Sequence, residues 1–114
     1  MEWSEAKKMI HKNITEGMDI NTKRSSFRKV IAVQEEKFIV QIGEKSKIKV
    51  PWSMLEKCFP SLKDDGGYNG KVFRSNYKEE AKVHPCYVHA VGMIFKKTEI
   101  ANSDAKESNY YLKK

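Results

Sequence analysis

The sequence predicts a small α+β domain in which an antiparallel sheet carries helices on one face. Three observations predict this class. Apolar residues near the N-terminus recur at helical spacing, and central segments alternate apolar and polar residues as strands do. Residues 84–95, HPCYVHAVGMIF, are apolar on nearly every side, which is typical of a buried helix. At 114 residues, the chain has the size of one compact domain.

An amphipathic first helix is expected over residues 4–16. Its apolar residues follow one another at spacings of three or four and so share one helical face: Trp3, Ala6, Ile10 and Ile14. Ser4 is the expected N-cap, and Gly17 is a natural C-terminal stop.

Three strands are expected next, over residues 26–33, 37–42 and 47–50. The first is rich in β-branched and aromatic residues, and the third alternates lysines with Ile48 and Val50. Because the connections between them are short, they favour an antiparallel meander of three to four strands.

A short helix is expected after Pro51. Ser53 and Glu56 match a capping box at its start, and Pro60 ends it. The glycine- and aspartate-rich residues 61–70 are expected to form a loop.

Residues 71–74 are predicted as a fourth strand, while residues 75–83 are ambiguous between helix and loop. Pro85 suits the first turn of the buried C-terminal helix, which runs to about residue 97 or 100.

The pattern divides the chain into a single small α+β domain over residues 1–101 and a polar C-terminal tail over residues 102–114, where periodicity is lost. Tyr110, Tyr111 and Leu112 could order this tail. The expected core gathers apolar residues from every predicted element: Trp3, Ile10, Phe38, Val40, Leu55, Val88, Val91 and Phe95.

Composition indicates an intracellular, cytoplasmic protein. The N-terminus has no apolar segment typical of a signal peptide, and the longest apolar run is far shorter than the roughly 20 residues that cross a bilayer. Only two cysteines occur, whereas secreted disulfide scaffolds contain more. No membrane partner is expected.

The net charge of +7 favours a polyanionic partner. Residues 20–34 contain four basic residues and no acid, and Phe27 is next to two of them. This interleaving of aromatic and basic residues is compatible with nucleic-acid binding. We therefore expect a small basic binding module without catalysis, which contacts phosphates through Lys23, Arg24, Arg28, Lys29, Lys47, Lys49, Lys71 and Arg74.

Two other interpretations stay open. The same basic residues could dock an acidic protein, as in an accessory or inhibitory factor, or could simply form a solvated surface. Alternatively, Cys86 and His89 lie three residues apart in the first turn of the last helix, where a thiolate can be stabilised, and they could form a thiol enzyme or redox site. A buried, inert cysteine gives the same pattern.

No metal or cofactor is expected. The spacing of His84, Cys86 and His89, with Cys58 as a further ligand, is unlike that of paired zinc motifs. The glycine-rich segment 66–70 lacks the lysine and the following helix of a phosphate-binding loop, so no nucleotide cofactor is indicated.

Overall fold

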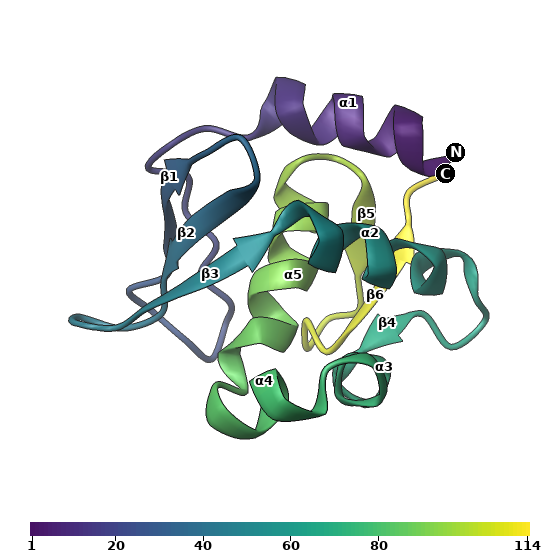
Figure 1. The fold of residues 1–114 in the computed structure, drawn as a ribbon. Coiled ribbons are helices and arrows are strands. Elements are labelled where there is room, and N and C mark those ends of the chain that lie inside the picture. Colours follow the sequence, from purple (N-terminus) through teal and green to yellow (C-terminus); the bar gives the residue numbers. More distant parts are fainter.

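The computed structural model, which describes residues 1–114, confirms the α+β class (Figure 1). The helix α5 lies at the centre, between two sheets of three strands each, ordered β1-β2-β3 and β4-β6-β5. The elements in chain order are α1 (Trp3–Asn13), β1 (Lys29–Val33), β2 (Lys37–Gln41), β3 (Lys47–Pro51), α2 (Trp52–Cys58), the 3-10 helix η1 (Phe59–Lys63), β4 (Tyr68–Asn69), α3 (Gly70–Asn76), α4 (Lys78–Val83), α5 (Cys86–Lys97), β5 (Ala101–Ser103) and β6 (Asn109–Leu112).

The helix α1 is confirmed, but its cap is not the expected one. Glu2 is the N-cap, and it forms a capping box with Glu5, so Ser4 lies inside the helix. The helix also ends before residue 16, because the backbone is extended at Ile14, whose side chain is buried in the core.

The meander β1-β2-β3 is antiparallel throughout, as expected. On its inner face, Val30, Val40 and Ile48 lie in one row across the three strands, and all three are buried. A bulge between Val30 and Ala32 shifts the register of β1. The strand β1 begins at Lys29 rather than at residue 26.

The region after the sheet differs from the prediction. Pro51 is the N-cap of α2, and Ser53 lies within the helix without capping it, so the predicted capping box is wrong. Pro60 does not end the helical path, because proline is tolerated in a first turn and the chain continues directly into η1. Residues 61–70 are therefore not simply a loop.

The predicted fourth strand over residues 71–74 is also wrong, because this segment is the helix α3. The Asn69 side chain accepts a hydrogen bond from the Val72 N–H at 3.1 Å and so caps the helix. The apolar side of the helix then places Phe73, which is buried, in stacked contact with the rings of Tyr77 and Tyr87. The ambiguous segment that follows contains the helix α4.

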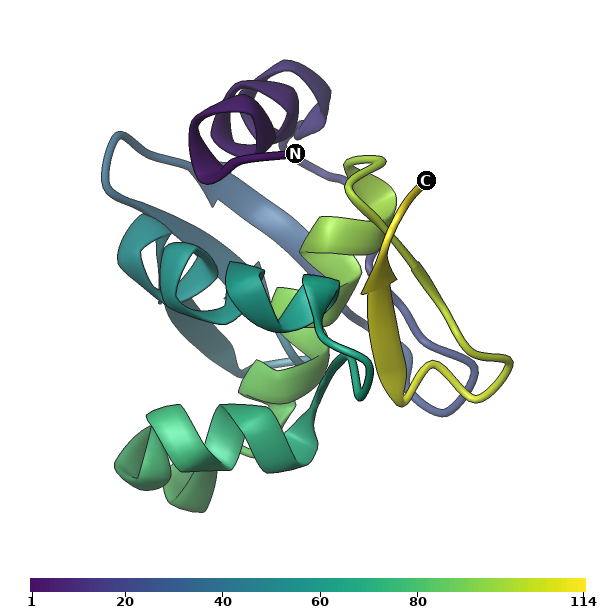
Figure 2. The same ribbon diagram turned by 90° about the vertical axis from the view of Figure 1, so that its right-hand side faces the viewer.

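The C-terminal residues are a β-hairpin rather than a polar tail. The strands β5 and β6 pair with each other, and β6 also pairs with β4 (Figure 2). Tyr110 on β6 is fully buried, and its hydroxyl donates to the Glu107 carbonyl at 3.0 Å. The prediction failed because a strand of four residues is too short to show periodicity. The predicted core is confirmed apart from Trp3, which is half-buried.

Candidate nucleic-acid interface and thiol site

The outer face of the three-stranded sheet is lined by lysines. The strand register puts Lys29, Gln41 and Lys47 in one row across β1, β2 and β3, and Ala32, Ile39 and Lys49 in the next. Lys29, Lys47 and Lys49 are exposed; within the three strands no acidic residue lies in either row, but Asp19 forms an isolated bridge with Lys29 and extends the first row beyond β1. The sheet therefore brings together three of the predicted phosphate ligands.

Lys37 shares this outer face and was missed by the sequence reasoning. It lies on β2 opposite Pro51, two residues from Ile39 on the same side of the strand, and its side chain is half-buried. The alternation of residues 37–41 would have placed it there. We call Lys29, Lys37, Lys47 and Lys49 the lysine face.

The loop that precedes β1 carries Lys23 and Arg24, both exposed. It is held to the C-terminal hairpin by Glu107, whose carboxylate accepts the Lys23 backbone N–H at 2.8 Å and contacts the Lys96 ammonium at 3.3 Å. The Lys23 contact uses its backbone, so that its side chain, like that of Arg24, lies on the surface of an anchored loop.

Phe27 projects from the same loop into solvent. Its side chain is 56% exposed, and its backbone has a φ of 62°. A positive φ is an outlier for a bulky residue, and such strain often occurs at ligand sites. A groove of about 450 Å³ adjoins the ring and is lined by residues that include Asp19, Asn21, Lys29 and Gln41.

Arg28, although adjacent to Phe27 in sequence, is directed into the molecule. Its Nη2 group donates to the Cys86 sulfur at 3.3 Å, while its Nε and Nη1 groups are buried without hydrogen-bond partners. None of the three ion pairs in the structure includes Arg28. This arginine is therefore not presented with the lysine face, and we leave it out of the proposed surface.

Cys86 and His89 lie in the first turn of α5, as expected, but no hydrogen bond joins them. His89 Nδ1 is buried without a partner. Burial and the nearby Arg28 guanidinium lower the pKa of His89, which favours the neutral imidazole. The structure thus adds Arg28 to the predicted pair. Sequence reasoning could not find this contact, since the two residues are 58 positions apart.

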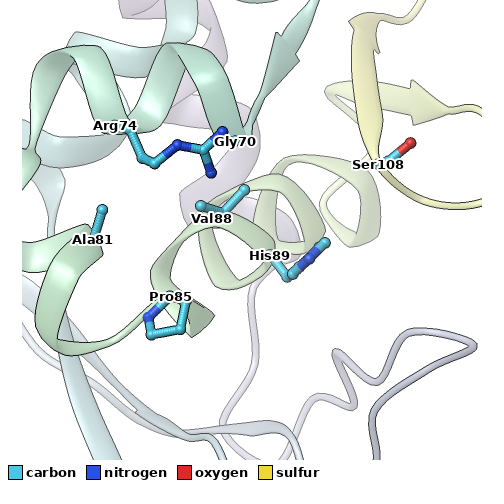
Figure 3. A pocket seen from close by; sticks show the side chains of 7 residues that line it. All are labelled: Gly70, Arg74, Ala81, Pro85, Val88, His89 and Ser108. Carbon is cyan, nitrogen blue, oxygen red and sulfur yellow. The ribbon is translucent and has the colours of Figure 1, made fainter.

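Lys71 and Arg74 lie elsewhere, on α3, which is on the other side of α5 from the three-stranded sheet (Figures 1 and 2). Arg74 lies over Gly70 at the edge of a pocket of about 290 Å³, with His89 and Ser108 on its other walls (Figure 3). The structure therefore does not bring these two predicted ligands together with the lysine face.

No group of three or more His, Cys, Asp or Glu side chains is placed to hold a metal ion, and no helix has the length and apolar character that crossing a membrane requires. Comparison with known protein families, with curated proteins and with solved structures finds no match to this chain.

Proposed function

We propose that this protein is a nucleic-acid-binding module, without catalysis, that holds phosphates on the lysine face and on the adjoining loop with Lys23 and Arg24. The observation that carries the proposal is the gathering of three exposed lysines on one sheet face, where the one acid in their rows is Asp19, at the β1 edge beside Lys29. Lysines placed in this way release counterions from a polyanion, and the β2 residues paired with Lys47 and Lys49 are uncharged.

The spacing of the lysines supports an extended ligand. Lys29 on β1 and Lys47 on β3 are separated by one strand, and therefore by about 10 Å. The uncharged Gln41 lies between them. Cationic side chains thus flank a strip along which a phosphodiester backbone can lie. The free thiols Cys58 and Cys86 fit a reducing compartment, so we place this function in the cytoplasm.

The test compares two triple variants that remove equal charge. The first changes Lys29, Lys47 and Lys49 to Gln, and the matched control changes the exposed Lys8, Lys12 and Lys97, which lie on helices, to Gln. Binding of labelled DNA and RNA is measured by fluorescence anisotropy at several salt concentrations. We expect the sheet variant to bind more weakly and to lower the slope of log K against log salt by about 2 to 3, as the loss of three phosphate contacts predicts.

We expect the control to lose little affinity. Equal losses in the two variants would mean that only net charge matters, and the proposed interface would be wrong. If neither DNA nor RNA bound at low salt, nucleic-acid binding itself would be refuted. An acidic protein partner would then be sought by pull-down after nuclease treatment.

The contact between Arg28 and Cys86 favours a second candidate function, a reactive thiol. A cation next to a cysteine is one feature of reactive thiols, and the Arg28 guanidinium donates to the Cys86 sulfur at 3.3 Å. We expect iodoacetamide to alkylate Cys86 and hardly to alkylate Cys58, because Cys58 is fully buried. Arg28→Met should slow the reaction of Cys86. An unchanged rate in that variant would reject a role for Arg28, and with it this candidate.

A further inference from the structure

We propose that the ligand is single-stranded nucleic acid and that one of its bases stacks on the ring of Phe27. This inference rests on the proposed function and specifies its ligand. The Phe27 ring is exposed to solvent and lines the same groove as Lys29. Phe27 is the one aromatic residue that lines this groove, and it is the most exposed aromatic side chain of the chain.

Hydrogen bonds hold the backbone next to the ring. Asn21 Oδ1 accepts the Arg28 N–H at 2.7 Å, and the Ile20 N–H donates to the Arg28 carbonyl at 3.1 Å. The Arg28 side chain is anchored on Cys86 in the interior. Arg28 is thus held on both its backbone and its side chain, while the neighbouring Phe27 is 56% exposed. An exposed ring on an anchored stretch of backbone needs little rearrangement to stack on a base.

The groove beside the ring offers polar groups suited to the edge of a base. Asn21 uses its oxygen for Arg28, and no hydrogen bond within the chain uses its NH₂ group. Gln41 uses its NH₂ group for the Gly43 carbonyl at 2.9 Å, which leaves its oxygen as an acceptor. A donor and an acceptor therefore line the groove that adjoins Phe27. Such amide groups recognise exposed base edges.

The groove also holds a charged acceptor. Asp19 is the one acid that lines it, beside Arg28 and Lys29, and its carboxylate accepts hydrogen bonds from the amino group of a base. We therefore place the base over Asp19 and Asn21 and the phosphates along the lysine face. In a duplex, both faces of each base are covered by neighbouring base pairs, so stacking on Phe27 requires an unpaired strand.

The test uses Phe27→Ala, Phe27→Trp and Phe27→Asn, with Tyr111→Ala as the matched control. Tyr111 is also a surface aromatic, 37% exposed, but it lies on β6. Asparagine tolerates a positive φ, so Phe27→Asn removes the ring while relieving backbone strain. The probes are a fluorescein-labelled single-stranded 10-mer, the same strand with abasic positions, and the duplex.

We expect Phe27→Ala and Phe27→Asn to weaken single-strand binding by about 5- to 150-fold, which corresponds to about 1–3 kcal/mol for one stacked base. Phe27→Trp and Tyr111→Ala should retain wild-type affinity. The abasic strand should bind wild-type protein as weakly as the intact strand binds Phe27→Ala, and duplex binding should not depend on residue 27.

Two outcomes would overturn the inference and leave the proposed function intact. One is unchanged single-strand affinity in folded Phe27→Asn while the lysine variant loses binding. The other is a duplex that binds as tightly as the single strand. If no nucleic acid binds the wild-type protein, the proposed function fails as well, so the two failures are distinguishable.

Discussion

Gly92→Ala should destabilise the protein even though alanine is a better helix former than glycine. Gly92 lies inside α5 and faces the buried ring of Tyr110 on β6. A Cβ atom at this position would lie 2.3 to 2.6 Å from three ring carbons, whereas ordinary contacts of this kind are 3.4–4 Å. Either the ring or the helix must therefore move by about an ångström.

The ring has little freedom to move. Tyr110 is fully buried, its hydroxyl is hydrogen-bonded to the Glu107 carbonyl, and its strand pairs with both β4 and β5. Overpacking of this kind costs about 1–3 kcal/mol and occasionally more. The higher helix propensity of alanine offsets about 1 kcal/mol of this cost. We expect a net loss of about 1 kcal/mol, and a melting temperature lower by roughly 4–8 °C for a domain of this size.

Urea unfolding, followed by circular dichroism, measures this loss. Gly66→Ala is the control, because a Cβ there would meet no atom within 4 Å. In a double-mutant cycle with Tyr110→Leu, most of the cost of Gly92→Ala should disappear, because the clash is with the ring. If Gly92→Ala were instead as stable as the wild type, or more stable, the close packing of α5 on the C-terminal hairpin would be refuted.

Three other perturbations test the packing around the proposed sites. Burial alone would raise the pKa of Glu107, but the Lys23 backbone N–H and the Lys96 ammonium lower this pKa below its usual value. The Glu107 carboxylate therefore stabilises the fold above about pH 4.5, and this stabilisation is lost as the pH falls. Glu107→Gln should lower stability at pH 7 and flatten its dependence on acidic pH, measured by thermal melts. Burial raises the pKa of Cys58 from 9.0 to about 12, so stability should decline as pH rises through this range, and a slope no shallower in Cys58→Ala would contradict this. Asn69→Ala removes the cap of α3 and should cost about 0.5–2 kcal/mol in urea unfolding; an unchanged midpoint would show that the cap is dispensable.

The elements that could be predicted from sequence are those whose own residues determine their burial. The helix α1 and the strands β2 and β3 each bury apolar residues of a single face, so their period indicates the element and the side that it buries, although β2 also carries Ile39 on its outer face. The helix α5 was recognisable because almost its whole circumference is apolar.

The errors fall where distant residues decide the structure. Val72 and Phe73 are adjacent apolar residues of the kind that strands favour. The segment is nevertheless helical, because Asn69 caps the helix and the rings of Tyr77 and Tyr87 pack on Phe73. Residues 109–112 are too few to show a period, and they form a strand because β4 and β5 supply partners on both sides. Short segments carry little intrinsic preference, so tertiary contacts override it.

The candidate site shows the same dependence at the level of single residues. In the sequence, Phe27, Arg28 and Lys29 form one continuous basic and aromatic run, which predicts a shared role. In the structure, Lys29 enters the outer face of the sheet, the Arg28 guanidinium contacts Cys86, and Phe27, at a positive φ, leaves its ring exposed. Arg28 thus anchors the loop that presents the other two. If the proposed interface is correct, Arg28→Met should therefore weaken single-strand binding in fluorescence anisotropy without changing its salt slope, whereas loss of a direct phosphate contact would lower that slope by about 1.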